Sequence, residues 1–253
     1  MSAGSPPLEA VVFDWGGTLT PFHSIEMEDM WRLAARHLAA HLPDDESAIT
    51  ARLMDVERAF WDRTAADACA GSLGDLLAEA TRALGVDVAE AVLEEAGVRY
   101  LDAWTPHITH DPDAAPTLRA LRERGLRIGL LSNTHWPRTF HEHFLERDGL
   151  AGLIDARLYT SEMTHMKPHP EAFRAALAAL GVLEPARAVF VGDRPFDDIH
   201  GARRSGLRAV LRPHPDVPAY DVRPDAEIAR LPELVPLVDR WGTVAGARGR
   251  TAR

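Results

Sequence analysis

Four polar side chains, far apart in the sequence, are candidates for one reactive centre. Asp14, Ser132 and Asp193 each come directly after a short apolar run of the kind that forms a buried strand. Lys167 follows a weaker strand pattern at 155–159. Because ligands of an open parallel sheet bind beyond the carboxyl ends of its strands, we expect these side chains to converge at one edge of a sheet.

These four groups suit the transfer of a phosphoryl group. Two carboxylates and a backbone carbonyl suffice to hold Mg2+, which prefers oxygen ligands and keeps several waters. A lysine and a hydroxyl can then position the phosphoryl oxygens and neutralise their charge. Taken singly, each residue is more often structural, since an Asp before Gly-Gly forms turns and Ser132-Asn133 suits a helix N-cap. The inference therefore rests on their combination and their order.

The lysine at position 167 is the single lysine of the sequence. All the other basic residues are arginine, so the arginine count reflects a general bias of the chain and carries little functional information. A lysine that is kept against this bias is more informative, because a compact ammonium and a planar guanidinium demand different surroundings.

The elements that must position these side chains predict an α/β fold with a helical insertion. A first strand at 9–13 is followed by a long stretch, from Ser24 to about Trp104, with helical periodicity throughout. Beyond it, strands alternate with helices, the strands at 126–131, 155–159, 188–191 and 208–211 and the last helix at 226–237. This alternation predicts a Rossmann-like parallel sheet with helices on both faces.

We divide the chain accordingly into a core, an insertion and a tail. Residues 1–20 and 109–241 form the predicted α/β core, and residues 21–108 form the inserted all-helical cap. Residues 242–253 have no apolar periodicity, and we expect them to be disordered.

Composition is that of a soluble globular protein and narrows the choice of partners. The 253 residues are 46% hydrophobic and carry a formal net charge of -10, which disfavours nucleic acid and anionic membranes as partners. Cys69 is the one cysteine, so no intramolecular disulfide and no cysteine-based zinc cluster can form. The first ten residues do not resemble a signal peptide, and no apolar run is long enough to span a membrane. We expect a cytoplasmic protein; its oligomeric state does not follow from the sequence.

Four segments resemble the motifs of one family, the haloacid dehalogenase-like hydrolases. They are VVFDWGGTLT at 11–20, LLSNT at 130–134, KPHPEAF at 167–173 and VGDRPFDDIHGARRSG at 191–206. They come in the order of that family, and the helical insertion falls where the family carries its helical cap, of the C1 type.

The resemblance implies a role for each matching residue. Asp14 would be the nucleophile that forms an aspartyl-phosphate, with Ser132 and Lys167 as the other catalytic residues. The phosphate would be bound by Ser132, Asn133 and Lys167. Mg2+ would be held at Asp14, the Gly16 carbonyl, Asp193 and Asp198, where Asp198, together with Asp197, would order the waters of the metal. The substrate would be a small phosphorylated metabolite that the cap selects.

Gly16 departs from the family pattern. Phosphatases of the family usually carry a second Asp at this position as general acid and base, a contribution typically worth about 10²–10⁴ in rate. The carbonyl of a glycine can still bind a metal, but the proton donor is missing. His23 and Glu26, at the entrance to the predicted cap, are candidate replacements; a solvated loop histidine and an acidic helix start are the simpler interpretations.

The missing Asp leaves other activities open. Haloacid dehalogenases also lack it, but they use no metal and lack the acidic fourth motif. Phosphonoacetaldehyde hydrolases need a cap lysine, and this insertion has none. A catalytically weak protein that binds a phosphorylated ligand is a third possibility. In the cap, Trp61 and Arg63 are candidate substrate contacts. The simpler interpretation is that Trp61 packs in the core of the cap and that Arg63 is solvated.

Overall fold

A six-stranded, fully parallel sheet forms the centre of the core. The computed structural model describes residues 6–21 and 25–244. The strands lie in the order β3-β2-β1-β4-β5-β6. Their bounds are Ala10–Phe13 for β1, Arg127–Ser132 for β2, Ala156–Tyr159 for β3, Ala188–Gly192 for β4, Arg208–Leu211 for β5 and Ala226–Glu227 for β6. The order places the carboxyl ends of β1, β2 and β4 side by side.

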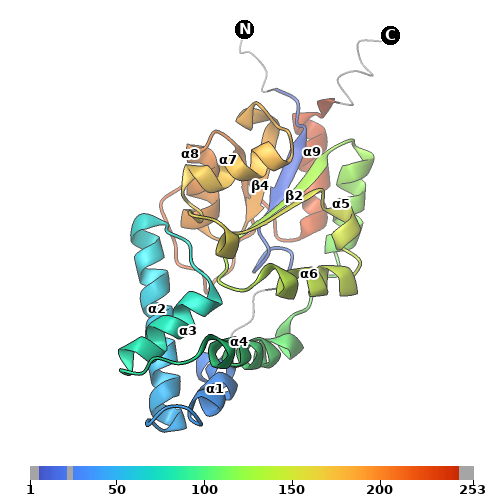
Figure 1. Cartoon of the computed structure of the whole chain (residues 1–253). Coiled ribbons are helices and arrows are strands. Elements are labelled where there is room, and N and C mark those ends of the chain that lie inside the picture. The colour runs from blue at the N-terminus through green and yellow to red at the C-terminus, as the bar shows by residue number, and fades with distance from the viewer. Residues whose placement is uncertain (1–5, 22–24, 245–253) are drawn as a thin grey trace, which may run out of the picture.

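Alternate residues of the central strands serve two separate hydrophobic clusters. In β1, Val11 and Phe13 pack on one face of the sheet with α5 (Ala114–Glu123), α6 (Arg138–Arg147) and α9 (Leu234–Trp241). Ala10 and Val12 pack on the other face with α7 (Pro170–Ala179) and α8 (Gly201–Arg204). Successive side chains of a strand point to opposite faces, so a strand that is apolar throughout needs helices on both (Figure 1). The predicted fold class is confirmed.

The last predicted helix, at 226–237, is wrong at its beginning. Ala226 and Glu227 instead form β6, paired with Val210 and Leu211 of β5. The helix starts later, after a 3-10 turn at Leu231–Glu233 that contains Pro232. Proline has no N–H to give to a helix interior but is well suited to a first turn, so it marks a helix start here.

The beginning of the predicted disordered tail is hydrogen-bonded to the backbone of Leu8. The Leu8 N–H donates to the Gly242 carbonyl at 2.8 Å, and the Val244 N–H donates to the Leu8 carbonyl at 3.0 Å. Three residues of the predicted tail, 242–244, are therefore part of the fold, and 245–253 lie outside the described residues.

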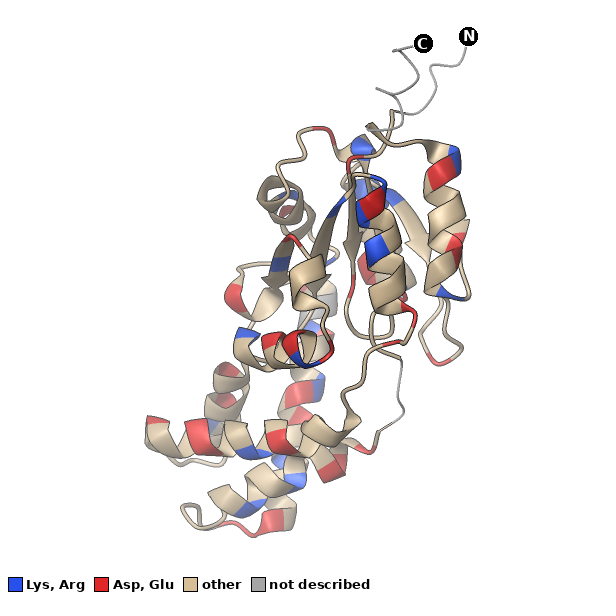
Figure 2. Cartoon of the chain, turned by 90° about the vertical axis from the view of Figure 1, so that its right-hand side faces the viewer, with Lys and Arg blue, Asp and Glu red and all other residues tan. Residues whose placement is uncertain are grey.

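Four helices between β1 and α5 make a second, separate core, which we call the helical insert. They are α1 (Met27–Leu38), α2 (Glu46–Asp67), α3 (Leu73–Ala83) and α4 (Glu90–Trp104). The Trp31 ring of α1 stacks on the Tyr100 ring of α4 with centroids 3.9 Å apart. Acidic and basic residues are interspersed along these helices (Figure 2). Among the described helices, none combines the length and the apolar character that crossing a membrane requires.

The segment between α2 and α3 joins the helical insert to the core by backbone hydrogen bonds. The Ala70 N–H donates to the Thr164 carbonyl, and the Met166 N–H donates to the Ala68 carbonyl. The Leu73 N–H, at the start of α3, donates to the carbonyl of His135 at 2.7 Å. These bonds hold the insert over the loops that follow β2 and β3.

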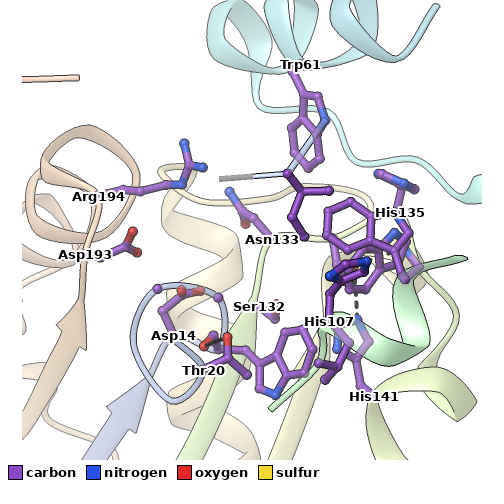
Figure 3. Close-up of a pocket in the computed structure, with 18 of the residues that line it drawn as sticks. Asp14, Thr20, Trp61, His107, Ser132, Asn133, His135, His141, Asp193 and Arg194 are labelled. Atoms are coloured by element: carbon purple, nitrogen blue, oxygen red, sulfur yellow. Dashed lines mark hydrogen bonds between the residues drawn. The ribbon is translucent and has the colours of Figure 1, made fainter. Parts of the chain in front are cut away.

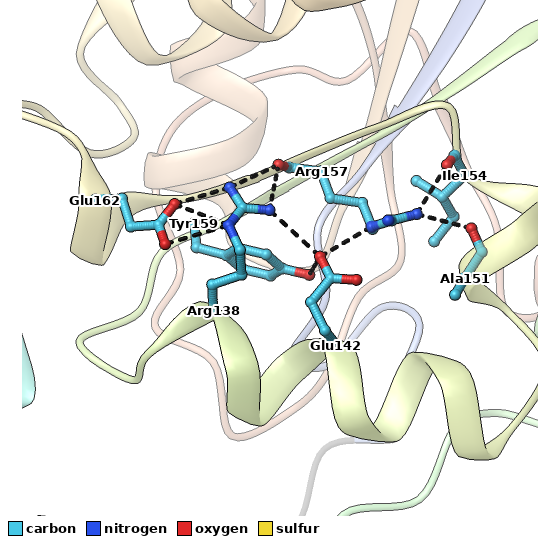
Figure 4. A network of polar contacts seen from close by, with 7 residues as sticks. All are labelled: Arg138, Glu142, Ala151, Ile154, Arg157, Tyr159 and Glu162. Carbon is cyan, nitrogen blue, oxygen red and sulfur yellow. Dashed lines mark hydrogen bonds and ion pairs between the residues drawn. The ribbon is translucent and has the colours of Figure 1, made fainter.

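A polar network fixes α6 against the edge strand β3 (Figure 4). Glu142 of α6 accepts hydrogen bonds from Arg138, Arg157 and the Tyr159 hydroxyl. Arg138 also pairs with Glu162 at 2.8 Å. Several charges that share partners in this way hold their geometry better than an isolated surface pair. The network matters for the site because α6 also carries His141, which lines the cavity described below.

Candidate active site

A buried lysine connects two buried carboxylates at the carboxyl edge of the sheet. Asp14 follows the last residue of β1, and Lys167 lies in the loop that leads to α7. The Lys167 Nζ is 2.6 Å from the Asp14 Oδ1 and 2.7 Å from the Asp198 Oδ1. The relative exposure of Lys167 is 2%. Burial of a charge is costly unless it is paired, so the two acids and the lysine stabilise one another.

Asp198 lies in a π-helical turn at Pro195–His200, which precedes α8. Its second oxygen, Oδ2, accepts from the backbone N–H of Arg194 at 2.9 Å. A Cβ added to Gly192 would overlap this carboxylate, which explains the glycine at the end of β4. Both oxygens of Asp198 are thus engaged, one by Lys167 and one by the backbone of its own motif.

Asp193 completes the acidic group from the end of β4. Its carboxylate lies against the backbone of Gly17, where an added Cβ would overlap it, and Gly17 has a φ of +79° that suits glycine. Among the described residues, the Asp193 Oδ1 has no hydrogen-bond partner although it is buried. Asp14, Asp193 and Asp198 each offer an oxygen within 4.8 Å of the others.

The electrostatics of this group favour a bound cation. Burial raises the pKa of Asp193 to about 8, and the charges of Asp14 and Asp198 act in the same direction. Burial also raises the pKa of Asp14 to about 6, against the opposite effect of Lys167. Burial alone would lower the pKa of Lys167, but the two carboxylates outweigh it and raise that pKa, so the lysine is charged. An orphaned carboxylate oxygen in a set of hard oxygen donors fits a divalent cation such as Mg2+.

Ser132 and Asn133 reach the same place from the end of β2. Ser132 is the last residue of the strand and is 3% exposed. The Asn133 side chain bonds to both backbone groups of Lys167: its Nδ2 donates to the carbonyl at 2.8 Å, and its Oδ1 accepts from the N–H at 2.9 Å. Asn133 therefore positions the lysine, a role that the sequence does not reveal, and one N–H of Nδ2 is left for the predicted phosphate contact.

A cavity of about 320 Å3 extends from these groups toward the helical insert (Figure 3). Its polar end contains Asp14, Gly16, Ser132, Lys167 and Asp193, together with Asn133 and Arg194. Its other end is lined by aromatic rings, those of Trp15, Trp61, Tyr100, Trp104 and Trp136. Apart from its two chain neighbours, no described residue has an atom within 4 Å of a Cβ built on Gly16, so a side chain at this position would enter open space.

The four candidate residues predicted in and near the cap lie in different places. Trp61 lines the cavity. Arg63 does not: it pairs with Glu79 at 3.0 Å, and both side chains are largely exposed. Glu26 is exposed and lines a separate surface hollow beside α1. His23 lies outside the described residues.

Comparison with protein families shows the family to which the chain belongs. The model of the family described as haloacid dehalogenase-like hydrolase matches residues 8–206. The chain belongs to this family. It is therefore a hydrolase, and its four motifs occupy the matched region.

Relatives of this hydrolase carry several activities in their names. The glyceraldehyde 3-phosphate phosphatase of Methanopyrus kandleri is 29% identical over 242 residues, which cover 91% of this chain and 97% of the relative. The phosphonoacetaldehyde hydrolase of Bordetella avium is 28% identical over 215 residues, 83% of this chain and 73% of the relative. The solved structure of a 2-haloacid dehalogenase from Pseudomonas syringae pv. Tomato DC3000 matches with a TM-score of 0.69 at 25% identity, covering 93% of this chain and all of that one.

The hydrolase also has cavity residues that sequence reasoning missed. Glu57 of α2 and His135, in the loop after β2, are both buried and both line the cavity. Glu57 could have been noticed in the sequence, because its helical spacing places it on the apolar face of α2 with Leu53, Val56 and Phe60. An acidic residue on a buried helix face requires polar partners, and it marks a polar site inside the insert.

Proposed function

We propose that this hydrolase is a Mg2+-dependent phosphomonoester hydrolase that forms an aspartyl-phosphate on Asp14. The observation that carries the proposal is the arrangement of Asp14 beside the charged Lys167 and the orphaned oxygen of Asp193, at the polar end of a cavity. The relative from Methanopyrus kandleri, which this chain matches over 97% of its length, is named as a phosphatase and supports the reaction class. In this proposal the helical insert is a cap that encloses a small phosphorylated metabolite.

In the first step a carboxylate oxygen of Asp14 attacks the phosphorus atom. A new oxygen–phosphorus bond forms, the ester bond breaks, and its electron pair leaves with the ester oxygen. The Lys167 ammonium and the Ser132 hydroxyl hold the phosphoryl oxygens and balance their charge. Bound Mg2+ would supply further positive charge beside the phosphoryl group. Asp14, Asp193 and the Gly16 carbonyl would hold it, while Asp198 pairs with Lys167.

In the second step water attacks the aspartyl-phosphate. The oxygen of the water bonds to phosphorus, the bond to Asp14 breaks, and the Asp14 carboxylate is restored. With glycine at position 16, that position has no carboxylic acid to protonate the leaving oxygen and no carboxylate to take the proton of the water. The leaving oxygen therefore departs as an anion or takes its proton from solvent, and the proton of the attacking water passes to the phosphate. We infer that the enzyme favours esters whose leaving groups are already weak bases.

The proposal is tested by hydrolysis of p-nitrophenyl phosphate by the metal-stripped protein with and without added Mg2+. We expect turnover that requires Mg2+ and that Asp14→Asn abolishes, with an unchanged far-ultraviolet circular dichroism spectrum and a cooperative unfolding transition as the control for folding. Release of chloride from 2-chloropropionate by the metal-stripped protein, with no phosphate release in Mg2+, would establish a dehalogenase instead. Stabilisation by phosphate esters without turnover of either substrate would establish a binding protein.

A further inference from the structure

The aromatic end of the cavity contains a buried carboxylate without a cationic partner. Glu57 is 7% exposed, and its Oε2 accepts from the Trp31 indole N–H at 2.7 Å. Its Oε1 accepts from the Tyr100 hydroxyl at 3.3 Å. Within the described residues no lysine or arginine forms an ion pair with Glu57; the one basic side chain near it is His135, at 3.7 Å. Burial lowers the pKa of His135 to about 3, so its ring is neutral at pH 7.

The hydrogen bonds around Tyr100 fix the tautomer of His135. Burial raises the pKa of Glu57, and the hydrogen bonds from Trp31 and Tyr100 act in the opposite direction. In its ionised form the Glu57 carboxylate can only accept, so the Tyr100 hydroxyl donates its proton to Glu57. His135 Nε2, 3.3 Å from the same hydroxyl oxygen, must then be the protonated nitrogen that donates to it. In a neutral ring this leaves Nδ1 as an acceptor. That Nδ1 is buried and has no partner in the described part of the chain, while His135 lines the cavity.

The walls around these two acceptors are ring faces, which attract cations. Trp61, Tyr100, Trp104 and Trp136 line this end of the cavity, and Figure 3 shows the Trp61 and His135 side chains around it. Among the lysines, arginines and acidic residues that line the cavity, Glu57 is the one that the helical insert contributes. Lys167 and Arg194 line the cavity from the core, where the predicted phosphate site lies.

Building on the proposed function, we propose that the substrate is a phosphomonoester whose leaving group carries a primary ammonium, bound between Glu57, His135 and the surrounding rings. An ammonium supplies the missing positive charge beside Glu57 and lies against aromatic faces. A neutral alkyl group of the same length fits the rings but brings no positive charge to Glu57. A carboxylate in the same place is repelled by Glu57. A trimethylammonium group carries the charge but has no N–H to donate to the Glu57 carboxylate.

The test compares leaving groups of matched length in the wild-type enzyme. Phosphate release is measured for ω-aminoalkyl phosphates of increasing chain length, for the n-alkyl phosphates of equal length, and for phosphoglycolate. We expect kcat/KM for the best aminoalkyl ester to exceed that of its alkyl counterpart by at least about tenfold, with phosphoglycolate poorer than either. Equal values for the amino and alkyl esters, or a preference for phosphoglycolate, would overturn the inference.

Two variants locate the preference in the helical insert. Glu57→Gln should reduce the amino-to-alkyl ratio to about one. Glu79→Gln, at a half-buried position on α3 of the same insert that does not line the cavity, should keep it. If Glu57→Gln does not fold, the wild-type series still decides. A ratio that Glu57→Gln leaves unchanged in a folded protein would assign the preference to another group and overturn the role of Glu57.

Binding to the Asp14→Asn variant separates this inference from the proposed function. Calorimetric titration with an aminoalkyl phosphate and its alkyl counterpart needs no turnover. Tighter binding of the amino ester, together with a wild type that hydrolyses no phosphate, would support the ammonium site and refute the phosphatase. Turnover of p-nitrophenyl phosphate without any preference for the amino ester would support the phosphatase and refute the ammonium site.

Discussion

The side-chain amide of Asn133 hydrogen-bonds to both backbone polar groups of Lys167, at 2.8 and 2.9 Å. The pair joins the end of β2 to the loop before α7, two segments separated by 34 positions in the chain. Because both bonds go to the backbone, they set where the lysine side chain begins, and the carboxylates of Asp14 and Asp198 set where it ends.

Replacing Asn133 should therefore act through Lys167. We expect Asn133→Ala to lower kcat for p-nitrophenyl phosphate by about 10- to 100-fold, the range seen when a partner that orients a site residue is lost. The loss of two buried hydrogen bonds should also lower the free energy of unfolding by about 1–3 kcal/mol, measured in urea. A variant with wild-type kcat and reduced stability would show that the contact is structural only.

Lys167 should not be replaceable by arginine. Lys167→Met leaves two buried carboxylates without their cation, and we expect a fall in kcat of more than about 10²-fold and a loss of about 3–5 kcal/mol of stability. Lys167→Arg keeps the charge, but its planar fork does not fit the place of an ammonium with two partners at 2.6 and 2.7 Å. Arg63→Lys, on the insert surface, is the matched control. Full activity of Lys167→Arg would contradict a geometric role.

Restoring an acid at position 16 should raise turnover. Gly16 does not have the positive φ that Gly17 has, and apart from its two chain neighbours no described residue has an atom within 4 Å of a Cβ at this position. We expect Gly16→Asp to fold, to raise kcat for alkyl phosphates by as much as about 10²-fold and to weaken the dependence of rate on leaving-group pKa. Gly16→Ala controls for the added Cβ. An unchanged leaving-group dependence in folded Gly16→Asp would show that another residue already supplies the proton.

Gly17, next to Gly16 in the same loop, should not tolerate a side chain. Gly17→Ala should lower the melting temperature, since its Cβ would overlap the Asp193 carboxylate and its φ is +79°. Alanine should therefore be tolerated at position 16 and should destabilise the protein at position 17. An unchanged melting temperature of Gly17→Ala would contradict the packing of Asp193 against this loop.

Buried histidines should make the protein sensitive to acid. His141 is fully buried against the Trp15 and Tyr159 rings, and burial lowers its pKa from 6.5 to about 3. Between these values the unfolded chain binds a proton that the folded protein does not. Stability is therefore lost as the pH falls below 6.5, by up to about 1.4 kcal/mol per pH unit for each such residue.

The contribution of His141 can be isolated by urea unfolding at pH 7 and pH 5. We expect His141→Gln to reduce the pH dependence of the unfolding free energy, while the exposed His143→Gln on the same helix leaves it as in the wild type. An identical slope in the wild type and in His141→Gln would mean that His141 is protonated in the folded protein.

Strand ends could be read from the sequence because they depend on local signals. Apolar runs that stop at Asp14, Ser132 and Asp193 indicate buried parallel strands, and the topology then brings their ends to one edge. The edge strand β6 was missed because its two residues are set by pairing with β5 and not by a pattern of their own. Non-local pairing of this kind overrides local propensity.

The aromatic end of the cavity could not be predicted. Glu57 and His135 come from different parts of the chain, and they meet because backbone hydrogen bonds, such as that from Leu73 to His135, hold the insert over the core. Arg63 shows the reverse case: it lies two residues after Trp61 of the cavity wall, yet it pairs with Glu79 away from the cavity. Which face of an inserted helix meets the core depends on that docking.

The central claim is that Asp14 carries the phosphoryl group during turnover. The most direct test is to quench the Mg2+-loaded enzyme in acid while it hydrolyses p-nitrophenyl phosphate, and to map the phosphorylated peptide by mass spectrometry. We predict one added phosphoryl group on the peptide that contains Asp14, absent from Asp14→Asn and from enzyme treated with a chelator. Turnover without phosphorylation of that peptide, in enzyme quenched during the first catalytic cycle, would contradict the account.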